Sequence, residues 1–108
     1  MQLYLARVVL ENTEAANEEI KIDLVLEGKN TKPGLDYFGV WQDKQTSVRC
    51  PFVMDPNGRA DFGTGYDGAD RYYESNILSL ALAIGLQVGW RDANGEATYR
   101  VTGITQLI

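Results

Sequence analysis

DRYYESNILSLALAIG, residues 70–85, is the stretch that decides the fold class predicted from this sequence, because the spacing of apolar residues changes there. From Asp70 onward they recur at i, i+4, i+7, i+8 and i+11, the spacing of one helix face. Asp70 or Ser75 can cap the start of such a helix, and Gly85 or Gly89 can end it. The sequence therefore predicts one helix, with a core-facing side formed by Tyr73, Ile77, Leu80, Ala81 and Ile84.

The rest of the chain predicts strands. The clearest is IKIDLVLE, residues 20–27, in which Ile20, Ile22, Leu24 and Leu26 share one face and charged side chains share the other. Asp92-Ala93-Asn94-Gly95 has the chemistry of a hairpin turn. Pro51 has no backbone N–H to donate and predicts an edge strand or a bulge. The other predicted strands are 3–10, 37–42, 48–54, 59–66, 86–90 and 98–104.

These elements add up to a single α+β domain over residues 1–108. It has about five strands, one helix and then a C-terminal β-hairpin, and the helix packs on one face of the antiparallel sheet. A chain of 108 residues is long enough to bury one core without metals or disulfides.

Charge and composition restrict the function. Fifteen acidic and ten basic residues give a net charge of −5, which disfavours nucleic acid and anionic membranes and favours a basic partner. Cys50 is the only cysteine, so no intramolecular disulfide is possible. The N-terminus lacks a secretory pattern, and the longest mostly apolar stretch, 77–86, is too short to span a bilayer. A cytoplasmic protein is expected.

The segment DFGTGYDG, residues 61–68, contains the spacing G-x-G-x-x-G of nucleotide-binding loops. The position about 20 residues after Gly68 is Val88, where a dinucleotide site needs an acid, and no second βαβ unit fits. The chain has no His, which excludes a kinase catalytic loop and a zinc site, and the spacing for Ca²⁺ is not met. The glycines are interpreted as a turn before the helix, and no cofactor or metal is expected.

The same region carries an acidic and aromatic cluster. Tyrosine suits interfaces because it gives a rigid contact with a polar tip, and carboxylates steer a basic partner. The predicted partner-binding residues are Asp61, Tyr66, Asp67, Asp70, Tyr72 and Glu74. The acidic loop 11–19, with four carboxylates, is the competing candidate. No catalytic residue is predicted, since no Ser–His or Cys–His arrangement exists.

The Ile20–Leu26 strand, RCPFV (49–53), DFGTGYDG (61–68) and SNILSLALAIG (75–85) together resemble a group of small bacterial domains in which a Cys-Pro-aromatic strand leads through a glycine-Asp turn into an Ala/Leu-rich helix. Such domains are similar to immunity proteins of toxin systems. The resemblance implies a non-enzymatic module that binds and neutralises a cognate toxin or other basic effector. The alternatives are a small enzyme or ligand-binding domain with a carboxylate-lined pocket between sheet and helix, and a structural subunit of a homo-oligomer.

Overall fold

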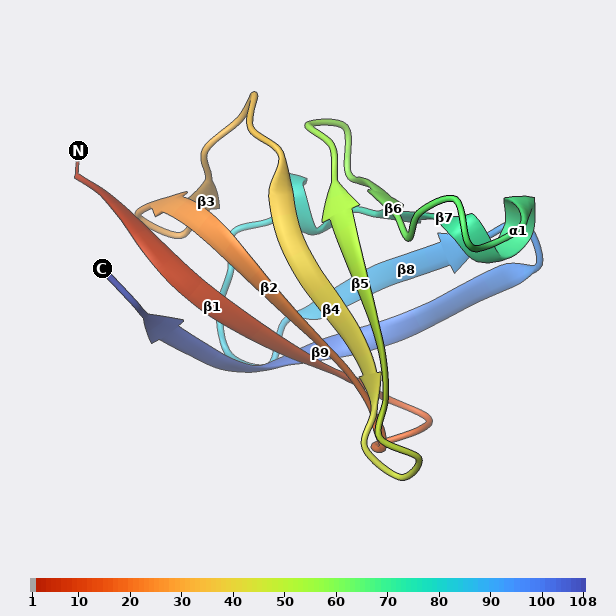
Figure 1. Ribbon diagram of the computed structural model, residues 1–108. Helices are drawn as coiled ribbons and strands as arrows, with labels where there is room; N and C mark the ends of the chain where they lie inside the picture. Colours follow the sequence, from red (N-terminus) through yellow and green to blue (C-terminus); the bar gives the residue numbers. More distant parts are fainter. Residues whose placement is uncertain (1) are drawn as a thin grey trace.

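The computed structural model describes residues 2–108 and is built almost entirely from strands (Figure 1). The elements in chain order are β1 (Leu3–Asn12), β2 (Glu18–Glu27), β3 (Asn30–Thr31), β4 (Tyr37–Asp43), β5 (Val48–Met54), β6 (Arg59–Asp61), α1 (Gly68–Arg71), β7 (Tyr72–Ser75), the 3-10 turn η1 (Ile77–Ser79), β8 (Gln87–Asp92) and β9 (Gly95–Gln106).

The strands form one closed antiparallel barrel. Their order is β1-β9-β8-β7-β6-β5-β4-β2, and a further pairing of β1 with β2 closes the circle, with β3 added beside β2. Every pairing is antiparallel. Closure removes exposed sheet edges along most of the wall and gives alternate residues an inner face to occupy.

The interior follows the alternation predicted for residues 20–27. Ile20, Ile22, Leu24 and Leu26 are all at most 1% exposed and point into the barrel. They face residues of the same kind on β1, since Ala6, Val8 and Leu10 pair with Leu24, Ile22 and Ile20. The strand prediction for this segment is confirmed, and so is the hairpin at 92–95, where Asp92 pairs with Gly95 between β8 and β9.

The wall of the barrel is uneven. β1, β2 and β9 are long strands, whereas β6 and β7 have three and four residues. The described pairings join β5 to β6 only at Val53 and Met54, so residues 48–52 of β5 pair only with β4. Pro51 lies in this one-sided segment, as its missing N–H predicted. The barrel wall is therefore weakest beside the N-terminal half of β5.

The predicted α+β fold is wrong, because residues 70–85 do not form a packed helix. α1 has four residues, and the chain then continues as β7, η1 and extended backbone, with Leu80 at φ −105° and ψ 147°. β7 pairs with β6 on one side and β8 on the other. Aromatic residues such as Tyr72 and Tyr73 favour strands, and tertiary pairing overrides a helical spacing.

The apolar residues of this stretch also divide differently from the prediction. Ile77 and Leu82 are buried at 0% and 2% exposure, whereas Ile84 is 64% exposed. The backbone N–H of Leu82 donates to the carbonyl of Lys29 at 2.8 Å, which holds the segment against the turn after β2. The segment therefore covers one end of the barrel instead of crossing a sheet face.

None of the helices in the described part of the chain is long and apolar enough to cross a membrane.

Candidate functional site

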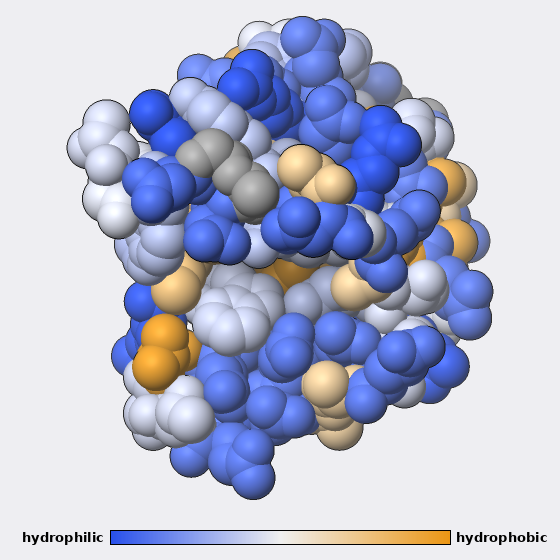
Figure 2. All heavy atoms as spheres, turned by 90° about the vertical axis from the view of Figure 1, so that its right-hand side faces the viewer, coloured by the Kyte–Doolittle hydropathy of each residue, from blue (hydrophilic) through white to orange (hydrophobic). Residues whose placement is uncertain are grey.

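The end of the barrel opposite Leu82 is open and holds a pocket of about 570 Å³. Figure 2 shows the pocket as a hollow between two bands of hydrophilic surface. Its volume lies within the range of small-molecule sites. Its aromatic lining residues are Trp41, Phe62, Tyr66, Tyr73, Trp90 and Tyr99.

Strand alternation places these rings inside the barrel. Trp41 lies two residues after Gly39 on β4, and Trp90 lies two residues after the buried Val88 on β8. The rings form a continuous wall, in which Trp90 stacks on Tyr73 with centroids 6.1 Å apart and meets Tyr99 edge-on at 6.3 Å. Such spacings are typical of favourable aromatic pairs.

Phe52 packs beneath this wall and is not among the described lining residues of the pocket. Its ring lies 5.4 Å from that of Trp90 and 5.1 Å from that of Phe62, and it is 2% exposed. Gly39 on the neighbouring strand leaves room for it, because a Cβ at that position would overlap the phenyl ring. A glycine inside a strand here marks a close approach of a side chain to the backbone.

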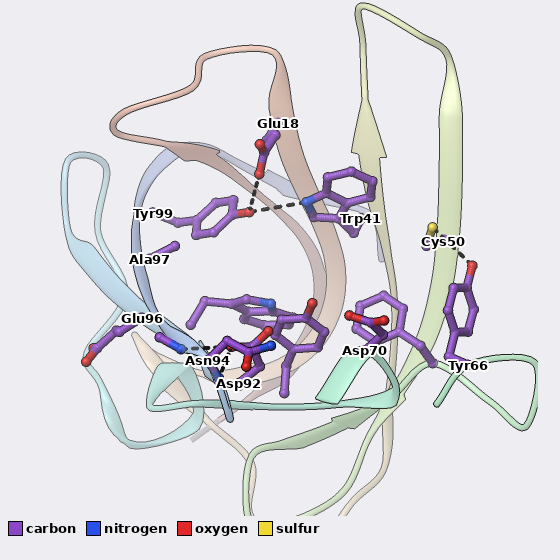
Figure 3. Close-up of a pocket in the computed structure, with 14 residues that line it drawn as sticks. Glu18, Trp41, Cys50, Tyr66, Asp70, Asp92, Asn94, Glu96, Ala97 and Tyr99 are labelled. Carbon is purple, nitrogen blue, oxygen red and sulfur yellow. Dashed lines mark hydrogen bonds between the residues drawn. The ribbon is translucent and has the colours of Figure 1, made fainter. Parts of the chain in front are cut away.

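The first polar cluster on the pocket wall consists of hydrogen-bonded side chains from β2, β4 and β9 (Figure 3). Trp41 Nε1 donates to the Tyr99 hydroxyl at 3.2 Å, and that hydroxyl donates to Glu18 Oε1 at 3.4 Å. Asn12 Nδ2 also donates to Glu18 Oε1, at 3.3 Å. Burial raises the pKa of Tyr99 to about 12, with the Glu18 charge adding to the effect. The phenol therefore stays neutral at physiological pH.

The second polar cluster on the pocket wall surrounds Tyr73 on β7. Burial raises the pKa of the Tyr73 phenol, and the charges of Asp92 and Asp70 raise it further. Asp92 is half-buried, and its Oδ1 accepts the backbone N–H groups of Asn94 and Gly95 at 2.8 and 3.0 Å. The hairpin turn thus fixes this carboxylate at the pocket wall.

The pocket is strongly acidic. Three carboxylates face it, and no lysine or arginine is among its described lining residues. Glu18 and Asp92 are half-buried, and Asp70 is exposed at the rim. Glu96 also borders the pocket, but its carboxylate points away from it, toward Gly89 on the outer side of the barrel. Negative charges at a partly desolvated site repel anions and attract cations. Within residues 2–108 no three His, Cys, Asp or Glu side chains gather into a group that could hold a metal ion.

Two of the six predicted partner-binding residues line this pocket. Tyr66 is 41% exposed at the rim, and its hydroxyl donates to Cys50 Sγ at 3.3 Å. Asp70 lies at the same rim, in α1. Asp67 is exposed outside the pocket lining, and its carbonyl accepts the N–H groups of Asp70 and Arg71. The structure therefore brings together only part of the predicted cluster.

The other three are engaged by arginines of the same chain. Arg71 Nε donates to Asp61 Oδ1 at 2.9 Å, and its guanidinium lies 4.8 Å from the centre of the Tyr72 ring. Arg91 bonds Glu74 at 2.7 Å. These internal contacts reduce the negative charge that Asp61 and Glu74 would present to a basic partner.

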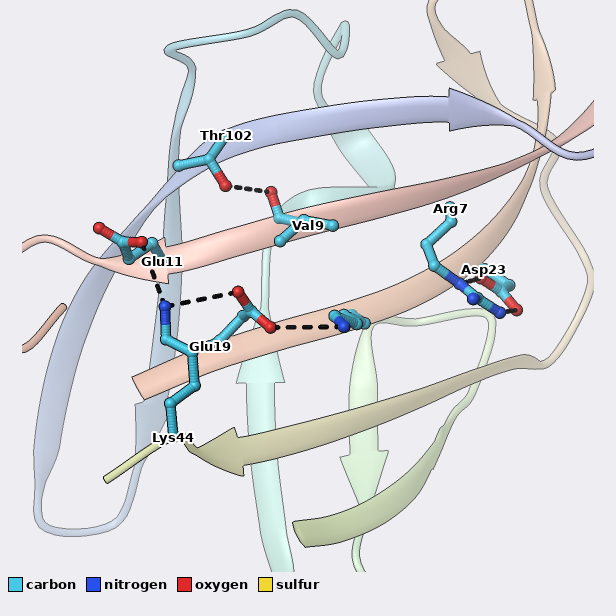
Figure 4. Close-up of polar contacts among 8 residues, drawn as sticks. Arg7, Val9, Glu11, Glu19, Asp23, Lys44 and Thr102 are labelled. Carbon is cyan, nitrogen blue, oxygen red and sulfur yellow. Dashed lines mark hydrogen bonds and ion pairs between the residues drawn. The ribbon is translucent and has the colours of Figure 1, made fainter. Parts of the chain in front are cut away.

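Much of the competing acidic loop is paired on the outside of the barrel (Figure 4). Lys44 Nζ lies 3.7 Å from a carboxylate oxygen of both Glu11 and Glu19. Glu18, from the same loop, instead turns into the pocket. Exposed ion pairs of this kind contribute little stability.

The glycine motif is a turn, as predicted, although no long helix follows it. Gly63 has φ +98°, and its N–H donates to Asp61 Oδ1 at 2.8 Å. The segment connects β6 to α1 and brings Phe62 and Tyr66 to the pocket.

The residues that sequence reasoning missed are those whose convergence depends on barrel closure, namely Glu18, Trp41, Trp90, Asp92 and Tyr99. Their signal was alternation: Trp90 and Asp92 are two apart on β8, and Trp41 continues the inward series of β4. Alternation shows that they share a face, and the circular strand order brings those faces together.

A scan against protein-family models and searches of curated proteins and solved structures found no significant match to this chain. The resemblance to immunity-type domains therefore stays a prediction.

Proposed function

We propose that this protein binds an organic cation, such as an amine or a quaternary ammonium group, in the pocket at the open end of its barrel. The observation that supports this most strongly is the lining itself: six aromatic residues and three carboxylates that face the pocket, with no basic side chain among the described residues that form it.

Each part of the lining contributes to cation recognition. The π faces of tryptophan and tyrosine attract a cation within about 6 Å, with about 0.5–2 kcal/mol per contact depending on desolvation. Trp41, Phe62 and Tyr73 are only partly buried, so the pocket exposes some aromatic surface to a ligand. The half-buried carboxylates of Glu18 and Asp92 supply the opposite charge in a site with less water than the surface.

This function is the ligand-binding alternative expected from the sequence, at a different location. The carboxylate-lined pocket is not between a sheet and a helix but inside the mouth of a barrel. Mouths of β-barrels are among the preferred positions of small-molecule sites.

The test uses the two tryptophans, which are the only ones in the chain and both line the pocket. Tryptophan fluorescence is titrated with choline and with its neutral isostere 3,3-dimethylbutan-1-ol. We expect choline to change the emission and saturate, and the neutral alcohol to bind much more weakly. Equal responses to both compounds, or no response to either, contradict the proposal.

Two variants locate the binding. Asp92→Asn removes a pocket charge, and the expected loss of choline affinity is roughly tenfold, from one partly buried charge pair. Glu27→Gln removes an exposed charge outside the described pocket lining and is the matched control for net charge. An equal loss in both variants would show that only the overall charge matters.

A second candidate is the neutralisation of a basic toxin or effector, with a lysine or arginine of that partner entering the same pocket. Tyr66 and Asp70 favour it, because both are exposed at the rim where a large partner would make contact. The test compares a short lysine-rich peptide with free butylamine. In this role the peptide binds more tightly by about tenfold and Tyr66→Ala removes that gain, as for an interface anchor. Equal affinities contradict it.

A further inference from the structure

The pocket has two separate carboxylate centres. The first, the Glu18 centre, consists of Glu18 with Tyr99 and Trp41. The second, the Asp92 centre, consists of Asp92 and Tyr73, which lie at the positions next to the paired Arg91 and Glu74 on β8 and β7 and both line the pocket, with Asp70 at the rim.

Trp90 separates the two centres. Its ring stacks on Tyr73, which belongs to the Asp92 centre, and meets Tyr99, which belongs to the Glu18 centre. In Figure 3, Glu18 lies beside Tyr99 and Trp41 at one side of the pocket, and Asp92 lies beside Asn94 at the other. The pocket acids also do not gather into a group that could hold a metal ion, in the part of the chain that the structure describes.

The charges that act on the two tyrosines agree with this separation. The Glu18 charge raises the pKa of Tyr99, and the charges of Asp92 and Asp70 raise that of Tyr73. Each phenol is thus influenced by the carboxylates of its own centre. Aromatic rings occupy the space between the centres, and their large apolar faces can pack against a methylene chain as well as attract a cation.

We infer that the preferred ligand carries two cationic groups joined by an apolar spacer, as in an alkyl diamine or a linear polyamine. This inference rests on the proposed function and specifies its ligand class. One ammonium group faces Glu18, the other faces Asp92, and the methylene chain lies along the aromatic wall between them. A ligand with a single charge satisfies one centre and leaves the other carboxylate without a partner.

Calorimetric titration with two matched series tests this. One series is the unbranched alkyl diamines from ethylenediamine to octane-1,8-diamine, and the other is the alkyl monoamines of the same chain lengths. We expect diamine affinity to pass through a maximum at an intermediate length. The best diamine should bind about tenfold more tightly than its monoamine, from one additional partly buried charge pair.

Two variants assign the gain to the two centres. Glu18→Gln and Asp92→Asn each keep an acceptor oxygen for their internal hydrogen bonds, and each should reduce the best diamine to about the affinity of its monoamine. Glu96→Gln, which removes a carboxylate that points away from the pocket, is the control and should preserve the diamine preference.

The outcomes separate this inference from the proposed function. If monoamines and diamines bind equally well to the unaltered protein, the two-centre inference is wrong and cation binding stands. If neither series binds, both are wrong. The comparison on the unaltered protein needs no variant to fold.

Discussion

The two ends of the barrel interior follow the same alternation of inward-facing residues and yet differ in every other respect. The closed end is filled by aliphatic side chains, with Leu24, Met54 and Ile77 each at 0% exposure. The open end is lined by aromatic rings and carboxylates around a pocket of about 570 Å³. The closed end stabilises the fold through its buried side chains, and the open end leaves room for a ligand.

The difference arises from one connecting segment. Residues 76–86 run from β7 to β8 and place Ile77 and Leu82 in the core, with Leu82 N–H bonded to the carbonyl of Lys29. At the open end, the connection between β8 and β9 is a tight turn at Ala93 and Asn94 that does not fold inward over the barrel. Barrels of this size are either filled by side chains or hold one small ligand, and this one does both at different ends.

The largest expected effect is a difference between the two ends in how much a substitution lowers the free energy of unfolding. Leu24→Ala at the closed end should lower the free energy of unfolding by about 2–5 kcal/mol, because it removes buried methyl groups and leaves a cavity. Tyr66→Leu at the open rim should cost less than about 1 kcal/mol, since Tyr66 is 41% exposed. Urea unfolding measures both. Similar losses would mean that the rim is packed as tightly as the core.

The next effect concerns Tyr99 at the open end. Its folded-state pKa is about 12, above the usual value of 10.0, so the folded state favours the neutral phenol. The stability from this shift is fully present below about pH 10 and is lost as pH rises toward 12, by about 2–3 kcal/mol. The free energy of unfolding, measured from pH 9 to 12, should fall more steeply with pH for the unaltered protein than for Tyr99→Phe. Parallel curves would contradict the burial of this phenol.

The close approach of Gly39 and Phe52 gives a smaller effect. Gly39→Ala places a Cβ against the ring of Phe52, and overpacking of this kind costs about 1–3 kcal/mol. Phe52→Leu shortens the opposing side chain, so the double variant should recover part of the loss that Gly39→Ala causes alone. Thermal unfolding of the single and double variants measures the coupling. Additive losses would show that Gly39 and Phe52 do not meet.

The smallest effect is expected outside both ends. The hydrogen bond from Arg71 lowers the pKa of Asp61, helped by the N–H of Gly63. The contribution of the Asp61 carboxylate to stability is therefore present above the ordinary carboxylate pKa and is lost as pH falls through the lowered pKa. Melting temperatures of Asp61→Asn and the unaltered protein should differ slightly at pH 7 and converge near pH 2. A constant difference across this range would assign the effect to the side chain's shape.

The sequence predicts the local features of this fold better than its closure. Alternation over residues 20–27, the turn at 92–95 and the position of Pro51 are all correct, because each depends on neighbouring residues. Closure depends on β1 pairing with both β2 and β9, which no local pattern encodes. The helix prediction for residues 70–85 is wrong because their apolar spacing fits a helix, whereas pairing with β6 and β8 makes part of the stretch a strand. The rest of the stretch covers one end of the barrel.

The site shows the same division. The sequence predicts Tyr66 and Asp70 as binding residues because they belong to a cluster along the chain, and both line the pocket. Trp41, Trp90 and Glu18 come from strands far apart in sequence and meet only because the sheet closes on itself. Predicting them requires the strand order as well as the strands.

The most direct test of cation binding at the open end is NMR observation of the two indole N–H signals during titration with tetramethylammonium. Trp41 and Trp90 line the pocket, whereas Leu24 and Ile77 fill the closed end and provide internal reference methyl signals. We predict saturable shifts of both indole signals, with the Leu24 and Ile77 methyl signals unchanged. Indole signals that do not move, or closed-end methyl signals that move as much, would contradict the account.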